Sequence, residues 1–325
     1  MTYIKSFFKN CAGAYIALAI LLIICCISNE SFRTVTNLTN ILRQCSYSGI
    51  IALGMTYIII AGGIDLAVGS LFALCGVVTI NTTLAIAAAG VSPIAATLIG
   101  CLAGIGLGIL GGAINGALVN LGKLPPFIAT LGTYSIYRSL ALYFANSGTV
   151  NCMSNNQIEA CFLNIGSSSF LSVATPVWIM LIIAIVLELI LCFTRYGKYT
   201  LATGASERVS QFSGINTSLM RFGSYAIVGL CVGVAAILFC GRMGAIQSSN
   251  AGQFYELDAI AAVVIGGASM AGGKGCIRGT IAGVLILGIV STILDFWHIS
   301  PALQGTVKGL VILISVLTQR KQKAK

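Results

Sequence analysis

Charged residues are scarce in this 325-residue chain: they make up only 8% of it, and just eight residues are acidic. Soluble domains usually have about 25% charged residues, so the composition excludes an ordinary soluble globule. Hydrophobic residues make up 57% of the chain, and the mean hydropathy is +0.98. The sequence therefore predicts an all-α polytopic membrane protein, built as one transmembrane domain over residues 1–325.

The sequence lacks the residues that several kinds of binding and catalytic chemistry require. The sequence has no GxxxxGK[ST] phosphate loop, and Gly272-Gly273-Lys274-Gly275 has neither its spacing nor the following Ser or Thr. His298 is the only histidine, and no CxxC pair occurs among the twelve cysteines. We therefore expect no enzyme, no catalytic residues, no metal site and no cofactor in this chain.

A net charge of +10 is typical of proteins that bind nucleic acid when the basic residues form one face, but here they lie in short loops and at the termini. That dispersal argues against a nucleic-acid surface and for a membrane topology.

Cys152 and Cys161 share a polar loop and can either pair or stay free, and we favour two free thiols.

Apolar runs long enough to cross a bilayer predict the spans. A helix needs roughly 17 to 25 apolar residues to cross, so we cut the chain at polar and Gly-Pro interruptions. Ten spans result: 12–28, 45–61, 67–89, 93–121, 125–145, 173–194, 222–240, 257–270, 278–296 and 302–318. The eighth is too short to cross unless it is tilted or preceded by ordered backbone. Five glycines in the fourth predict close helix packing: Gly104, Gly106, Gly108, Gly111 and Gly112.

The distribution of Lys and Arg predicts the orientation. With the N-terminus inside, the inner segments hold thirteen basic residues and the outer loops hold only Arg33, Arg43 and Arg242. By the positive-inside rule, both termini are cytoplasmic. Arg138 and Lys308 fall inside predicted spans, where each can snorkel to an interface or line a polar path.

An acid stands in a glycine-rich interruption between two apolar runs: Gly62-Gly63-Ile64-Asp65-Leu66-Ala67-Val68-Gly69-Ser70. A carboxylate at membrane depth must be paired, solvated or protonated. Broken helices there are tolerated only where protein or a water-filled cavity satisfies the backbone. Asp65 is therefore a candidate for a translocation path or gate, together with Gly62, Gly63 and Gly69. Capping of the following helix is an equally open interpretation.

A faint repeat relates this stretch to a second one. Asp258 also follows a Gly-containing segment and opens an apolar run, and on the predicted topology it starts from the outer side whereas Asp65 starts from the inner side. That relation is typical of an inverted-topology repeat. Asp258 is thus a second candidate for the path, with helix capping again as the alternative.

Two long loops are expected. The outer loop, 146–172, can meet an extracytoplasmic partner or serve as a solvated connection. The cytoplasmic loop, 195–221, contains a stretch that predicts a short helix exposing Glu207 and Arg208 and ending near Gly214. Such a helix can pass motion to a cytosolic protein, or it can be a capped surface turn. Glu188, in the sixth span, can carry a proton, but we favour a buried acid hydrogen-bonded to a neighbouring helix.

Three motifs carry a resemblance to a known family. They are the 62–70 stretch, Pro125-Pro126-Phe127-Ile128-Ala129-Thr130-Leu131-Gly132-Thr133, and Tyr255-Glu256-Leu257-Asp258-Ala259-Ile260-Ala261-Ala262-Val263-Val264-Ile265-Gly266-Gly267 with the 272–275 turn. Over residues 37–317 the chain resembles the ribose-type permease subunits of bacterial ABC sugar importers. The resemblance implies a multi-pass protein of the bacterial inner (plasma) membrane that moves a monosaccharide into the cytoplasm.

The resemblance also implies partners: a cytosolic ABC ATPase subunit that binds the ATP, an extracytoplasmic sugar-binding protein, and a second permease copy, identical or related. It implies that residues 204–215 are the coupling helix seated in the ATPase. Candidate coupling residues are Gly204, Ser206, Glu207, Arg208, Ser213 and Gly214.

The chain departs from the family pattern at three places. Ser206 stands where members usually have Asn, and Val209-Ser210 stand where they have an Ala-Ala pair. Asp295 replaces part of an Asn-rich motif and adds an outer acid that can touch substrate or binding protein. Two alternatives to sugar import stay open: an ion-coupled secondary transporter using Asp65, Asp258 or Glu188, and an ABC permease for a nucleoside, an amino acid or a sugar-like signal molecule.

Overall fold

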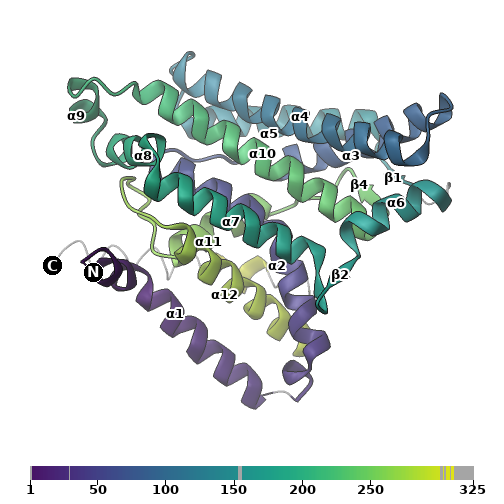
Figure 1. Ribbon diagram of the computed structural model, residues 1–325, viewed down its shortest axis with the longest axis horizontal. Helices are drawn as coiled ribbons and strands as arrows, with labels where there is room; N and C mark the ends of the chain where they lie inside the picture. The colour runs from purple at the N-terminus through teal and green to yellow at the C-terminus, as the bar shows by residue number, and fades with distance from the viewer. Residues whose placement is uncertain are drawn as a thin grey trace.

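Helices make up nearly all of the regular structure in the computed structural model (Figure 1). It describes residues 2–28, 30–152 and 156–300, and beyond these 303, 305–307, 309 and 310. The long helices are α1 (Thr2–Ser28), α2 (Val35–Ile60), α3 (Val68–Ala88), α4 (Pro93–Asn120), α5 (Pro126–Phe144), α7 (Thr175–Phe193), α10 (Thr217–Met243) and α12 (Ile277–Phe296). Shorter elements are η1 (Glu30–Arg33), α6 (Asn156–Gly166), α8 (Arg195–Ala205), α9 (Glu207–Phe212) and α11 (Tyr255–Ile265).

Five of the described helices are long and apolar enough to cross a membrane: α3, α4, α7, α10 and α12. The all-α membrane class is therefore confirmed. The helices α4, α5 and α7 each have a proline in the first turn, where its fixed φ favours helix initiation and its missing N–H costs nothing.

α2 is the central helix of the protein. From Ser46 to Ile60 nearly every side chain is buried, because α7, α10, α11 and α12 all pack around it. The Tyr57 hydroxyl in its last turns donates to the Leu187 carbonyl of α7 at 2.6 Å. A membrane span was predicted over 45–61, and the helix that contains most of it begins earlier, at Val35. Thr34 caps this helix by accepting from the Asn37 N–H, so residues 35–44, including Arg43, are helical as well.

Glycines hold α4 against two neighbours. A Cβ at Gly104 would meet the Thr79 side chain of α3, and a Cβ at Gly108 would meet the Gly229 carbonyl of α10. Gly111 and Gly112 are just as closely packed, so the predicted glycine seam is confirmed for four of its five members. Gly106 has open space around it and is not part of the seam.

The predicted outer loop is partly ordered structure. It contains α6 and the strand β1 (Thr149–Asn151), which pairs antiparallel with β4 (Ala245–Gln247) in the register Val150 to Ile246. A second hairpin pairs β2 (Ser169–Phe170) with β3 (Val173–Ala174). These elements gather at the right of Figure 1, whereas α8 and α9 lie at the opposite end. The segment 146–172 is therefore not an irregular loop throughout, and both of its expected roles stay predictions.

The short eighth span is explained by what precedes it. α11 has only 11 residues, and β4 and the ordered turns at 248–254 lead into it. The helix ends at Ile265 instead of 270, because Gly267 at φ 95° turns the chain away. The tenth predicted span, 302–318, and with it Lys308, lies almost entirely outside the described residues.

Candidate functional site

The first helix break lies between α2 and α3. Gly62 adopts φ 80°, a left-handed conformation that side chains rarely take, and its N–H and that of Gly63 fold back to the Ile59 and Ile58 carbonyls. A Cβ at Gly63 would crowd Ile58 and the Tyr225 hydroxyl. The chain therefore needs glycine here for both the turn and the close approach of α10.

Asp65 is the polar centre of this break. Its side chain is 1% exposed, and Oδ1 accepts from the Ala67 N–H at 2.8 Å, at the residue that precedes α3. The Asn115 amide donates to both carboxylate oxygens at 3.3 and 3.1 Å, and the Asn115 oxygen accepts from the Tyr137 hydroxyl at 3.2 Å. Asp65 therefore holds the turn that precedes α3, but it does not cap the helix, because α3 has no side-chain cap hydrogen bond.

The second break precedes α11, and Arg138 of α5 organises it. Its guanidinium donates from one nitrogen to the Ser248 and Ala251 carbonyls at 2.7 and 3.0 Å. The two roles left open for Arg138, snorkelling to an interface and lining a polar path, stay predictions. The observed contact shows a cation that satisfies two backbone carbonyls in the turns before α11.

The two breaks touch each other. A Cβ at Gly69, in the first turn of α3, would overlap the Gly252 carbonyl and the Glu256 carboxylate. A Cβ at Gly252 would in turn overlap the Gly69 carbonyl, and Gly252 has φ 69°. The starts of α3 and α11 are therefore in backbone contact, and both glycines are required for it.

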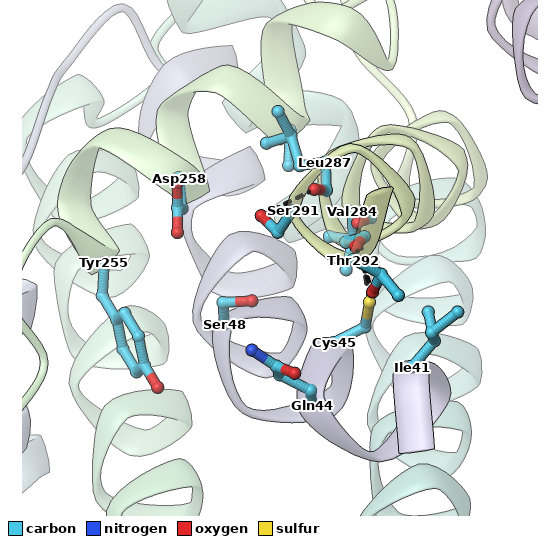
Figure 2. Close-up of a pocket in the computed structure, with 12 residues that line it drawn as sticks. Ile41, Gln44, Cys45, Ser48, Tyr255, Asp258, Val284, Leu287, Ser291 and Thr292 are labelled. Carbon is cyan, nitrogen blue, oxygen red and sulfur yellow. Dashed lines mark hydrogen bonds between the residues drawn. The ribbon is translucent and has the colours of Figure 1, made fainter. Parts of the chain in front are cut away.

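Asp258 lines an open pocket beside the second break. The pocket has a volume of about 110 Å³ and lies between α2, α11 and α12. Figure 2 shows Asp258, Ser48 and Gln44 around one space, with Tyr255 on one side and Ser291 on the other. Thr292 adds a further hydroxyl to the lining. Carboxylate, amide and hydroxyl groups together can bind a small neutral molecule that carries several hydroxyls.

Asp295 is not part of this pocket. It lies in the last turn of α12, its side chain is exposed, and its carbonyl accepts from the His298 N–H at 3.0 Å. The structure thus separates Asp295 from Asp258 and from Asp65, although the sequence placed all three in one candidate group.

The predicted short helix is α9. Ser206 caps it by accepting from the Val209 N–H at 3.4 Å, and Gly214 at φ 77° follows its end. Ser213, at the C-cap, donates to the Val209 carbonyl. Arg208 is exposed, as predicted, with its guanidinium 5.9 Å from the centre of the Phe212 ring. Glu207 is only partly exposed, because Arg221 binds it.

Gly204 has a different environment from the rest of the predicted group. It belongs to α8, and a Cβ there would overlap the Ile60 carbonyl and the Gly273 nitrogen. The Gly273 N–H itself donates to the Ile60 carbonyl at 2.9 Å. The end of α2, the last turn of α8 and the turn after α11 therefore meet at this glycine.

Glu188 binds the start of α12. Its side chain is buried, and its oxygens accept from the Ile277 N–H and pair with Arg278, each at 3.2 Å. This is the buried, hydrogen-bonded acid that the sequence analysis favoured over a proton carrier.

Cys152 and Cys161 are free thiols in the structure. Burial raises the pKa of Cys152, whose Sγ donates to the Gly244 carbonyl.

Sequence reasoning missed two residues that hold the site, Asn115 and Arg221, and it identified Arg138 without the groups that it binds. A lone Asn on an apolar helix and a lone Arg inside a predicted span were the available signals, but nothing in the sequence named their partners. Within the described part of the chain, no group of three or more His, Cys, Asp or Glu side chains could hold a metal ion.

Comparison with known proteins gives a consistent result. A family model described as "Branched-chain amino acid transport system / permease component" matches residues 37–316. The ribose import permease proteins of Bacillus subtilis (strain 168) and Escherichia coli (strain K12) are 39% and 40% identical to the chain, over 96% and 95% of it and 93% of each relative. The D-allose transport system permease protein of E. coli (strain K12) is 35% identical over 95% of the chain and 91% of its own length. No solved structure is significantly similar to the chain.

Proposed function

Because the chain belongs to the permease-component family whose model covers residues 37–316, we propose that it is the membrane subunit of an ATP-driven importer for ribose or a similar monosaccharide. The observation that carries the cargo assignment is near-full-length identity of about 40% to permeases for ribose, stronger than the identity to the allose permease. We place the protein in the plasma membrane as a transport subunit and not an enzyme.

The chemistry of the pocket around Asp258 supports a sugar as cargo. A monosaccharide is neutral, so it needs hydrogen-bonding groups and not a countercharge. Gln44, Ser48, Ser291 and Thr292 provide such groups, and Asp258 adds a strong acceptor. We assign Asp258 to sugar contact during passage. Asp65, Gly62, Gly63 and Gly69 instead shape the gate where the two breaks meet. Asp295 remains available at the outer end for the sugar-binding protein.

The full topology extends this proposal. We infer ten spans with both termini in the cytoplasm, because the basic residues concentrate on the predicted inner segments. In this topology α8 and α9 face the cytoplasm, and β1, β4 and α6 face outward. The backbone contact between the starts of α3 and α11 supports an inverted repeat, since the corresponding half-helices of such repeats meet near the membrane midplane.

Partners follow from the same assignment. We propose that α9 and the residues around it, Gly204, Ser206, Glu207, Arg208, Ser213 and Gly214, form the contact with a cytosolic ATPase subunit. ATP is bound there and not by this chain, for which we propose no cofactor. A second permease copy, identical or related, completes the path, and an extracytoplasmic binding protein delivers the sugar.

The test is uptake into proteoliposomes that contain the chain with its co-purified ATPase and binding protein. We expect uptake of labelled ribose to require ATP at the ATPase side and to persist when an uncoupler abolishes the proton gradient. Uptake that needs no ATP and stops with the uncoupler would instead establish an ion-coupled transporter. Glu188 was one of the proton carriers that this alternative requires. Its ion pair with Arg278 and its hydrogen bond from the Ile277 N–H argue against proton carriage by Glu188. Competition by unlabelled allose, arabinose or leucine then ranks the cargo.

A further inference from the structure

Two charged side chains join the short helix α9 to α10. Glu207 is the first residue of α9, and Arg221 lies in the second turn of α10. Both terminal nitrogens of Arg221 donate to Glu207, one to each carboxylate oxygen, at 2.9 and 2.8 Å. A two-point contact of this kind fixes orientation as well as distance, so α9 cannot rotate independently of α10 while it holds.

The same arginine also reaches the first helix break. Its Nε donates to the Ala61 carbonyl at 3.5 Å, immediately before Gly62. One turn further along α10, the Tyr225 hydroxyl donates to the Ile64 carbonyl at 3.0 Å. The side chains of α10 therefore hold the backbone on both sides of Gly62 and Gly63. The two glycines are the segment between these anchors with the most backbone freedom.

These contacts surround an open space. A cavity of about 500 Å³ is lined by Gly62, Gly63, Glu207, Arg221 and Tyr225, among others. Because the space beside the contacts is empty of protein, a shift of α9 can displace Arg221 without a collision. A packed core would resist such a shift.

We propose that Arg221 is a positioning residue that transmits movement of α9 to the Gly62-Gly63 break and thereby couples ATP hydrolysis to opening of the path. The proposal rests on the assignment of α9 to the ATPase contact. When α9 moves, Glu207 moves with it and displaces the Arg221 guanidinium that it binds. This displacement breaks or shifts the hydrogen bond from Arg221 to the Ala61 carbonyl. The backbone from Ala61 to Asp65 then changes where α3 begins.

The chain provides a matched control in the neighbouring helix. Arg195 is the first residue of α8; it is exposed and does not belong to the residues assigned to the ATPase contact. If the short helices need positive charge only as such, Arg195 matters as much as Arg221. If transmission is the role of Arg221, only variants of the Arg221 and Glu207 pair change coupling.

The experiment uses the whole complex with its ATPase and binding protein in proteoliposomes, with labelled ribose as the probe. Sugar uptake and ATP hydrolysis are measured in the same preparation for wild type, Arg221→Lys, Glu207→Gln and Arg195→Gln. For the first two variants we expect the ratio of ribose imported to ATP hydrolysed to fall about tenfold, within the usual range of coupling between sites. The ratio for Arg195→Gln should equal that of wild type.

Three results would overturn the proposal. One is an unchanged ratio in assembled Arg221→Lys and Glu207→Gln complexes, and another is an equal fall in the ratio for Arg195→Gln. The third is failure of both pair variants to assemble with the ATPase, which would make the pair a folding or docking determinant. Failure of the proposed function looks different, because the wild-type complex would then show no ATP-dependent uptake of ribose.

Discussion

Asp65 and Asp258 stand at similar places in the chain, but the structure holds them differently. Asp65 is 1% exposed and accepts hydrogen bonds from Asn115 and Ala67, whereas Asp258 lines an open pocket with hydroxyl and amide groups. The first break is held by side chains of α4 and α10, and the second by Arg138 and by the pairing of β1 with β4. The comparison teaches that one local pattern can give a buried, hydrogen-bonded acid at one break and an acid that lines an open pocket at the other.

The largest effect is expected when the buried carboxylate is removed. Asp65→Ala leaves the Asn115 amide and the Ala67 N–H without their acceptor in a water-free position. Each orphaned group costs about 1–3 kcal/mol, so we expect a clear loss of folded protein. Thermal unfolding in detergent measures this loss. Asp65→Asn, which keeps an acceptor for the Ala67 N–H, should lose less, and an equal loss for both variants would contradict the role of Asp65 in holding the turn before α3.

The second break should respond to Arg138. Arg138→Gln keeps a donor but removes the charge that binds the Ser248 and Ala251 carbonyls. A hydrogen bond to a charged group contributes about 1.5–3 kcal/mol. Since about 1.4 kcal/mol changes an equilibrium constant tenfold, the fraction of complexes with this break correctly held, and with it the uptake per molecule, should fall about tenfold or more. Ribose uptake normalised to assembled complex is the measurement. Wild-type uptake in Arg138→Gln would show that this break does not depend on the cation.

A smaller and more specific effect is expected at Asp258. Asp258→Asn should leave thermal stability near wild type. It should raise the ribose concentration needed for half-maximal uptake severalfold, because the variant loses the charge that strengthens one hydrogen bond to the sugar. Glu30→Gln is the control, because the Glu30 side chain is 95% exposed and Glu30 is outside the pocket. Equal shifts for the two variants would remove the distinction between the pocket acid and an exposed acid elsewhere.

The smallest effect is expected at Glu188. Glu188→Gln keeps an acceptor for the Ile277 N–H and loses only the pairing with Arg278, whose side chain is 49% exposed. Uptake driven by ATP should stay within about threefold of wild type, since an exposed partner contributes little. Abolished uptake with intact assembly would return Glu188 to consideration as a proton carrier.

Much of the fold was predictable because apolar length is a direct consequence of bilayer thickness. Spans such as 93–121 and 278–296 differ from the observed helices by one residue at an end. The start of α2 was not predictable from hydropathy, because Thr34 initiates the helix in a polar stretch. The helix α9 was predictable from its cap and its glycine, since both signals are local.

The partners of the site residues were less predictable, because they depend on tertiary packing. The sequence identified Asp65 but not Asn115, which is 50 residues away on α4. It likewise identified Glu207 but not its pairing with Arg221, and it identified Arg138 but not the carbonyls that Arg138 binds. Gly69 was identified as a path residue, and its contact with Gly252 became visible only in three dimensions.

The division of roles between the two acids can be measured directly by comparing Asp65→Asn and Asp258→Asn in one assay. Both variants are reconstituted with the ATPase and binding protein, and ribose uptake per folded complex is recorded across ribose concentrations together with thermal unfolding. The account predicts that Asp65→Asn lowers thermal stability with an unchanged half-maximal ribose concentration, whereas Asp258→Asn raises that concentration with unchanged stability. The opposite assignment, or identical behaviour of the two variants, would contradict it.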